Sequence, residues 1–255
     1  MVSLIIFIGL IIIAFLAGVI GASVGPGGVL LIASLYRFTD LTPTQIAGTS
    51  STLFIPGLML ASIVYARSGD LRMRLAITLG ITSVVGTMVG VRLNQFVSSS
   101  MFGVLLSLLL VWSGCYILFR REGNISTETT TDHSPKTLYF SVPGFIIGIF
   151  GGILGIGGPV LAVPALMLLR VPIVPAVAAA QVQGLFITVS TSTNYFTSGS
   201  VSFSLVALLL LPMLTGVVIG WRLAQRVSSR KLTYSLGIIL IGLGVLLFGD
   251  AVSIL

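Results

Sequence analysis

The chain has 255 residues, of which 56% are hydrophobic and only 7% are charged, so it has too little polar surface for a soluble globular protein of its length. It is predicted to be a polytopic membrane protein. A net charge of +7 could indicate a nucleic-acid partner, but the basic residues lie in short loops between apolar runs, which the positive-inside rule explains better. The single cysteine, Cys115, excludes an intrachain disulfide and a cysteine-based metal site.

The first half of the chain contains five apolar runs, separated by charged residues or by glycine and proline. They cover residues 3–24, 26–36, 44–66, 75–91 and 101–119. The full-length runs suit membrane-spanning helices of about 20 residues. The run 26–36 would reach only about 17 Å as a helix, so it is expected to be a half-helix or a re-entrant segment. Residues 2–22 are interpreted as mature protein rather than a signal peptide, because they lack a basic start.

A sustained polar stretch, residues 120–137, separates this half from a second one and is predicted to be a linker. The second half again contains five apolar runs, at residues 138–155, 159–169, 174–196, 203–221 and 232–249. The predicted organisation is therefore an N-terminal unit 1–119, a linker 120–137 and a C-terminal unit 138–255.

The two halves are repeats of each other at a constant offset of 130 residues. Phe15 and Gly18 correspond to Phe145 and Gly148, and Tyr65 corresponds to Tyr195. The sequence G-V-R-L-N-Q-F-V-S-S from Gly90 matches G-W-R-L-A-Q-R-V-S-S at the corresponding place without a gap. An ungapped match of this length is a strong repeat signal, so the fold class is an all-α membrane protein of two repeats with about five helical elements each.

The distribution of positive charge predicts that the repeats have inverted topology. The loop around Arg67, Arg72 and Arg74 is basic, whereas its counterpart 197–202 carries no charge, and the next pair of loops reverses this contrast. An inverted arrangement places all Lys and Arg except Arg37 and Arg92 inside, while a parallel arrangement would divide them almost equally. The linker is then predicted to be cytoplasmic, and both termini are predicted to lie on the outer side of the plasma (inner) membrane.

A glycine-rich stretch occurs at the same place in both halves, at residues 15–31 and 144–166. The clusters of Gly and Pro are expected to break each helix and restart it, because Pro suits a first helical turn. Discontinuous helices of this kind commonly mark the binding site of a transporter, and inversion brings the two breaks together near the midplane. Exposed N–H groups there suit an anion. The candidate donors are Gly27, Gly28, Gly157 and Gly158; the alternative is that the glycines only allow tight helix crossing.

Polar side chains inside two apolar runs are the other candidates for substrate binding. They are Thr49, Ser50, Ser51, Gln181 and Gln183. Ser and Thr in membrane helices also bond their own backbone, so the hydroxyls have a structural alternative. Gln is costly to bury without a partner, which favours Gln181 as a ligand. Tyr65 and Tyr195 lie near predicted interfaces and are interpreted as aromatic-belt residues.

Several motifs together resemble the sulfite exporter TauE/SafE family. They are the paired glycine stretches, A-G-T-S-S from Ala47, the G-D-L loop from Gly69 and G-T-M-V-G-V-R-L from Gly86. The resemblance covers nearly the whole chain and implies transport of small sulfur-containing or organic anions such as sulfite and sulfonates. The two halves differ at two corresponding positions: Ser34 corresponds to Pro164, and Thr49 corresponds to Ala179. They are therefore expected to contribute unequally to a site.

No enzyme constellation is visible, because the spans hold no His-Asp pair, no carboxylate pair and no phosphate loop followed by Lys. The chain is predicted to be a secondary transporter, an exporter that works by alternating access around a midplane site. An anion channel of the same architecture and a non-transporting scaffold or assembly subunit are the alternatives. The expected partners are a small anion and the lipid bilayer, without nucleic acid, metal or cofactor; the oligomeric state stays open, with a homo-oligomer among the options.

Overall fold

The computed structural model describes residues 2–23, 27–69, 71–119, 138–224 and 229–253. Within these residues each predicted run forms one helix. The helices are α1 (Val2–Ser23), α2 (Gly28–Phe38), α3 (Pro43–Ser68), α4 (Met73–Asn94), α5 (Ser99–Phe119), α6 (Leu138–Leu154), α7 (Pro159–Leu168), α8 (Ile173–Thr197), α9 (Phe203–Ala224) and α10 (Ser229–Ser253). The prediction of an all-α membrane fold is confirmed. The predicted linker, 120–137, lies outside the described residues.

Among the described residues, six helices are long and apolar enough to span a membrane, namely α1, α3, α4, α5, α8 and α9. The two helices that follow the glycine stretches are much shorter: α2 has 11 residues and α7 has 10. At 1.5 Å per residue they reach about 17 and 15 Å, roughly half of a hydrocarbon core of about 30 Å. Both are therefore half-helices that cannot cross the membrane alone.

Local sequence explains where the central helix α3 begins and ends. The Thr42 hydroxyl accepts a hydrogen bond from the Gln45 N–H, and the Gln45 side chain accepts one from the Thr42 N–H at 3.0 Å, which is a capping box. Pro43 occupies the first helical turn, where its missing N–H removes no helical bond. The helix ends at Gly69, whose φ of 82° is a left-handed conformation that glycine adopts without strain.

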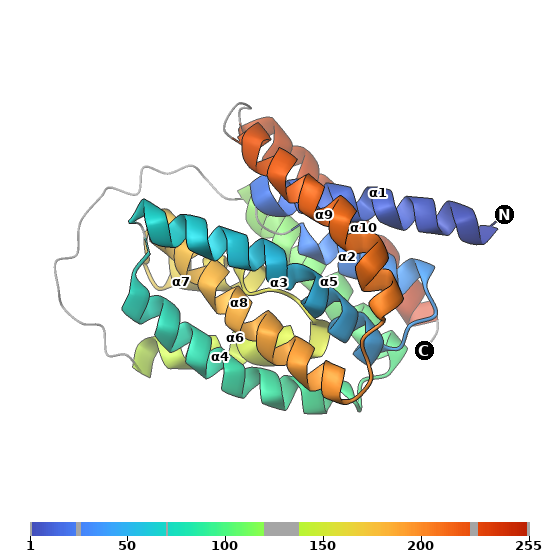
Figure 1. The fold of residues 1–255 in the computed structure, drawn as a ribbon, viewed down its shortest axis with the longest axis horizontal. Helices are drawn as coiled ribbons and strands as arrows, with labels where there is room; N and C mark the ends of the chain where they lie inside the picture. The colour runs from blue at the N-terminus through green and yellow to red at the C-terminus, as the bar shows by residue number, and fades with distance from the viewer. Residues whose placement is uncertain (1, 24–26, 70, 120–137, 225–228, 254–255) are drawn as a thin grey trace.

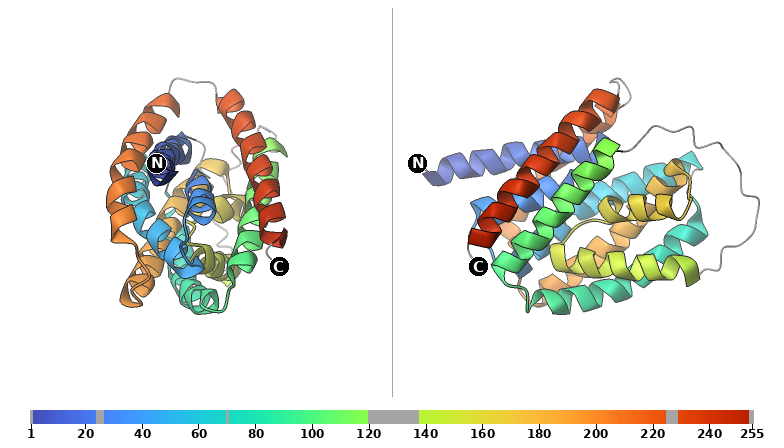
Figure 2. Two further views of the ribbon diagram at one scale, coloured as in Figure 1. Left: turned by 90° about the vertical axis from the view of Figure 1, so that its right-hand side faces the viewer. Right: turned by 180° about the vertical axis from the view of Figure 1, so that it is seen from behind.

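The two halves share one core, because the main helix pairs join one half to the other. The helix α1 packs against α9, α4 against α6, α3 against α8, and α5 against α10. The first two pairs are equivalent under the 130-residue offset. Figure 2 shows α5 and α10 side by side in both of its views, while Figure 1 shows α3 and α8 crossing the centre of the molecule.

Glycines allow the equivalent pairs to cross closely. A side chain on Gly86 would collide with the backbone carbonyl of Phe145, and one on Gly216 would collide with that of Phe15. Gly148 meets the Ser83 backbone in the same way. The offset of 130 residues relates the first two contacts, so the glycine pattern of α4, α6, α1 and α9 is explained by helix packing.

The equivalent helices α3 and α8 run antiparallel. A Cβ placed on Gly48, near the start of α3, would lie 2.8 Å from the Cβ of Tyr195, near the end of α8. Further along, the Thr52 and Ser192 hydroxyls are 2.8 Å apart, and Leu58 lies against Gly184. Opposite directions of equivalent helices are what an inverted repeat requires, and Figure 1 shows the two courses. The side of the membrane that each end faces stays a prediction.

Candidate functional site

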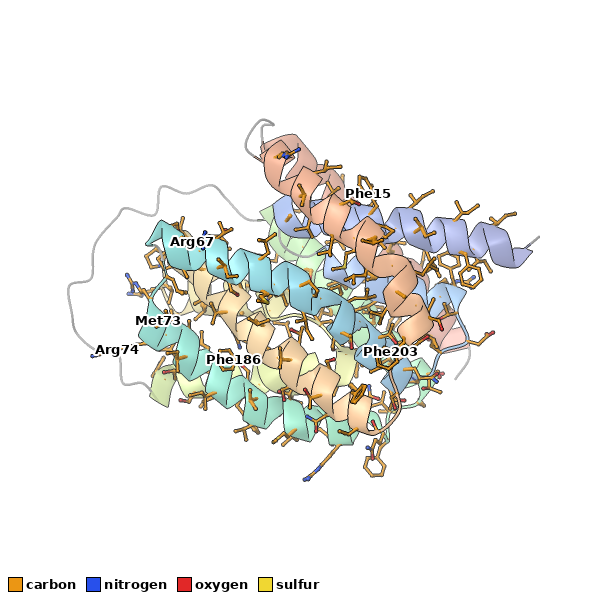
Figure 3. All side chains as sticks on the ribbon, viewed as in Figure 1. Phe15, Arg67, Met73, Arg74, Phe186 and Phe203 are labelled. Carbon is orange, nitrogen blue, oxygen red and sulfur yellow. The ribbon has the colours of Figure 1, made fainter. Side chains whose placement is uncertain are left out.

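A cavity of about 520 Å³ lies between α1, α3, α9 and the starts of the two half-helices. Its lining consists of Ala17, Gly18, Gly21, Ala22, Gly28, Phe54, Gly57, Leu58, Leu60, Ala61, Val64, Tyr65, Ser68, Ile156, Gly157, Pro159, Val160, Gln181, Met213, Val217 and Val218. Along α3 the cavity extends from Phe54 to Ser68, a length of about 21 Å. Figure 3 shows Arg67 and Arg74 at the end of the molecule where the cavity reaches Ser68, and Phe203 towards the other end.

The floor of the cavity is where the two half-helices begin. A Cβ on Gly28 would lie 3.0 Å from the Phe54 ring, and a Cβ on Gly157 would lie 3.1 Å from Leu58 Cδ1. Phe54 and Leu58 are one turn apart in the middle of α3, so both N-termini lie beside the same turn, at half the depth of the bundle. The two half-helices thus begin beside each other, while their position at the membrane midplane stays a prediction.

The N-termini of α2 and α7 present backbone N–H groups that no side chain of a described residue caps. In α7 the first bonds run from Leu161 and Ala162 to the Gly158 carbonyl, at 3.2 and 2.8 Å. Gly157 and Val160 precede these donors and are among the residues that line the cavity. Their N–H groups have no acceptor among the described residues. Such groups, together with the helix dipole, attract an anion.

Gln181 is the polar side chain nearest to this floor. It lies on α8, lines the cavity and is only partly buried. Its amide makes no hydrogen bond to another described residue. The Gln181 amide can donate hydrogen bonds to an oxyanion from the same side as the α7 N-terminus.

Two of the four predicted backbone donors pack against protein instead of lining the cavity. A Cβ on Gly27 would lie 2.8 Å from the Gly21 Cα atom and would also collide with the Ala17 carbonyl, so α2 begins tightly against α1. A Cβ on Gly158 would lie 2.8 Å from the Gly184 nitrogen of α8. The structure thus brings Gly28 and Gly157 to the cavity but not Gly27 or Gly158.

The hydroxyl patch on α3 is fully buried away from the cavity. Ser51 donates to the Ala47 carbonyl at 2.7 Å, and Ser50 donates to the Ile46 carbonyl at 2.8 Å. Thr49 accepts from the Ser202 N–H at 3.0 Å, which ties the start of α3 to the loop before α9. The structural alternative for these hydroxyls therefore fits their surroundings better than substrate binding.

Gln183 is fully buried and connects three helices. Its amide nitrogen donates to the Ser83 hydroxyl at 2.6 Å, and that hydroxyl donates to the Gly144 carbonyl at 2.7 Å. The chain of bonds joins α8 to α4 and α6. The Gln183 Oε1 atom has no partner among the described residues, but it does not line the cavity.

The end of the bundle away from Ser68 is closed by hydrogen bonds around the break between α6 and α7. The Tyr195 hydroxyl donates to the Gly152 carbonyl at 2.9 Å, the Asn94 amide donates to the Ile153 carbonyl, and Ser50 donates to the Gly155 carbonyl at 3.2 Å. Gly155 has a φ of 70°, the left-handed conformation that reverses the chain there. Tyr195 is 1% exposed, so its interpretation as a belt residue is wrong.

Several residues of the cavity were absent from the predicted set. Phe54 and Leu58 are four residues apart, so they share one face of α3. Nothing in the sequence shows that this face, rather than another, meets the two breaks. Tyr65 lines the cavity, although its sequence position near the end of a span favours a belt role. Among the described residues that line the cavity, none carries a formal charge.

The comparisons with known proteins agree with this architecture. The model of the family described as "Sulfite exporter TauE/SafE" matches residues 10–247. The chain is 25% identical to the "Probable membrane transporter protein MJ0441" of Methanocaldococcus jannaschii, with 91% of each chain covered. It is also 25% identical to the "Probable membrane transporter protein YunE" of Bacillus subtilis, with 96% of this chain and 98% of that one covered. No solved structure matches the chain.

Proposed function

Because the chain belongs to the sulfite exporter TauE/SafE family, we propose that this multi-pass membrane transporter exports a small sulfur-containing or organic anion, such as sulfite or a sulfonate. The observation that carries the proposal is the cavity floor at half depth, where the starts of both half-helices meet beside Gln181. Gly28, Gly157 and Gln181 form the binding site.

The chemistry of the floor favours a monovalent anion. Uncapped N–H groups at two helix starts provide partial positive charge, and a neutral lining avoids the desolvation of a fixed cation. A sulfonate or sulfite offers several oxygen acceptors to these donors and to the Gln181 amide. A site without a lysine or arginine holds the anion weakly enough to release it on the other side.

Alternating access is supported by a difference between two interfaces that are equivalent in the repeats. Between α3 and the α1–α9 pair the structure contains the cavity of about 520 Å³. In the equivalent place α8 packs more closely against α4, which leaves a hollow of about 460 Å³ along Val84, Met88 and Val189. Phe186 packs on Gly80 there, and Gln183 is bonded to Ser83. The alternate state would close α3 onto α9 and separate α8 from α4. With the end near Arg67 in the cytoplasm, the cavity of this state faces the substrate to be exported.

Export needs no titrating side chain within the membrane in this proposal. The middles of the predicted spans contain no Asp, Glu, Lys or His. A cell interior that is negative by about 100 mV favours efflux of a monovalent anion by roughly 2.3 kcal/mol. Transport is therefore electrogenic and driven by the membrane potential together with the substrate gradient.

Reconstituted protein tests the function and separates it from its rivals. Proteoliposomes are assayed for uptake of sulfite, thiosulfate, methanesulfonate and acetate under a potassium-valinomycin potential at equal pH. The transporter gives saturable, potential-dependent flux and counter-transport of labelled against unlabelled substrate. Unsaturable flux without counter-transport identifies the channel, and the absence of any anion flux favours the scaffold. Flux that ignores the potential and follows a pH gradient contradicts the electrogenic mechanism.

A further inference from the structure

The cavity is larger than an inorganic oxyanion requires. Its volume of about 520 Å³ lies within the range of roughly 300–1,000 Å³ that proteins use for organic ligands of drug size. A water molecule occupies about 30 Å³, and a bare oxyanion of four heavy atoms fills only a small part of this space. Most of the volume therefore lies beyond the groups that would hold the anionic charge.

The polar and apolar parts of the lining are separated in space. The uncapped N–H groups and Gln181 lie at the floor, beside the turn of α3 that contains Leu58. Beyond this turn the α3 wall consists of Leu60, Ala61 and Val64, and the polar residues Tyr65 and Ser68 follow at its far end. Val64 is six residues from Leu58, so this wall is about 9 Å long.

The facing wall is also apolar. Met213, Val217 and Val218 of α9 lie opposite the α3 residues, and Ala17 and Gly21 of α1 also line the cavity. A hydrated inorganic anion gains nothing from such walls, because they offer no group to replace its water. A hydrocarbon chain in the same space is removed from water and is stabilised in proportion to its buried area.

We propose that the substrate is an amphiphilic monoanion, in which one sulfonate or carboxylate head is joined to an apolar body of several carbons. The head binds at the floor, at Gly28, Gly157 and Gln181. The body lies between α3 and α9 along Leu60, Val64 and Val217. This inference rests on the proposed function, since it requires the floor to bind an anionic head, and it selects among the organic anions that the function allows.

A series of linear alkanesulfonates tests the inference. Binding of methane-, propane- and hexanesulfonate to the purified protein in lipid nanodiscs is measured by calorimetry, with empty nanodiscs subtracted. Each methylene that the walls bury lowers the dissociation constant about fourfold, since burial of one CH₂ is worth about 0.8 kcal/mol. Hexanesulfonate therefore binds at least a hundredfold more tightly than methanesulfonate.

Matched variants test whether the hydrocarbon chain of the sulfonate lies within the cavity. Val64→Thr keeps the side-chain shape but adds a hydroxyl to the wall, and it lowers the hexanesulfonate-to-methanesulfonate affinity ratio by about threefold or more. Ile63→Thr introduces the same hydroxyl, with the loss of one further carbon, at the neighbouring position. Ile63 does not line the cavity, so this variant leaves the ratio unchanged. Gln181→Leu weakens the binding of all three sulfonates by a similar factor.

The failures of the inference and of the function can be distinguished. If methanesulfonate binds but the length of the alkyl chain does not change the dissociation constant, the floor binds anions and the proposal of an apolar body is wrong. A chain-length effect that Val64→Thr and Ile63→Thr alter equally, or not at all, places the hydrocarbon in the surrounding lipid and also overturns the inference. If neither sulfite nor any sulfonate binds, the proposed function itself fails.

Discussion

Gln181 and Gln183 are two residues apart on α8, yet their side chains lie in different surroundings. Gln181 faces the cavity without a described partner, whereas Gln183 is fully buried against Ser83. We expect Gln181→Leu to raise the half-saturation concentration of transport about 10- to 100-fold, because a hydrogen bond to a charged group contributes about 1.5–3 kcal/mol. Expression and thermal midpoint stay close to those of the parent protein.

Gln183→Leu is the matched comparison for this prediction. Replacement of Gln183 breaks the bond between α8 and α4, so it lowers the thermal midpoint rather than only the affinity. Transport kinetics and thermal unfolding of both variants in the same lipid measure the contrast. Normal transport by Gln181→Leu at limiting substrate would make Gln181 a structural residue.

Gly157 and its repeat counterpart Gly27 are predicted to differ when they are enlarged. A Cβ on Gly157 meets only the flexible Leu58 side chain, at 3.1 Å, whereas a Cβ on Gly27 collides with the backbone of α1. Gly157→Ala should therefore fold and transport with reduced affinity, because the methyl group crowds the anion site. Gly27→Ala should lower the yield of folded protein, measured by size-exclusion chromatography. Equal folding defects in both variants would contradict the placement of Gly157 on an open floor.

The sequence could predict part of this site for identifiable reasons. Glycine and proline at the breaks indicated where the half-helices begin. The inverted repeat predicted that the two breaks meet. The rotation of each helix about its own axis was not predictable, because contacts with other helices set it. The sequence therefore could not show that Ser51 bonds within its own helix, or that Phe54 and Leu58 face the floor.

The crossings of α1 with α9 and of α4 with α6 depend on glycines that leave no room for a side chain. Gly86→Ala should lower the thermal midpoint by about 2–10 °C, since overpacking of a well-packed contact costs about 1–3 kcal/mol. Gly9 is a matched control, because a Cβ there meets nothing within 4 Å. Scanning calorimetry or a thermal-shift assay in detergent compares the two alanine variants. An unchanged midpoint for Gly86→Ala would mean that the helices separate easily at this crossing.

At the level of the elements, the apolar runs and the half-helices were predictable from hydrophobic length alone. The predicted bounds of α2, 26–36, differ by about two residues from Gly28–Phe38. The pairing of α1 with α9 was not predictable, because it joins segments from opposite ends of the chain. Nor did the repeats reveal that α8 packs more closely against α4 than α3 packs against α9, since that difference is a property of one conformational state.

The whole molecule is predicted to have its two repeats inverted across the membrane. Ser68 ends α3 and Thr197 ends α8, and these helices run antiparallel. Arg37 and Asp250 form an ion pair of 2.9 Å, which puts the end of α2 and the end of α10 at one level, as expected if both face outwards. In a Cys115→Ser background, Ser68→Cys should react with an impermeant maleimide from the inside and Thr197→Cys from the outside. Labelling of both from one side would refute the inversion.

Substrate protection of a cysteine at the cavity floor tests most directly whether an anion binds where the half-helices meet. In the Cys115→Ser background, Leu58→Cys places a thiol beside Gly157, and Arg67→Cys places one at the end of α3, outside the cavity lining. Saturating substrate should slow alkylation of Leu58→Cys severalfold, with half-protection at the concentration that half-saturates transport, while Arg67→Cys reacts at an unchanged rate. Equal alkylation of Leu58→Cys with and without a transported anion would contradict the binding site.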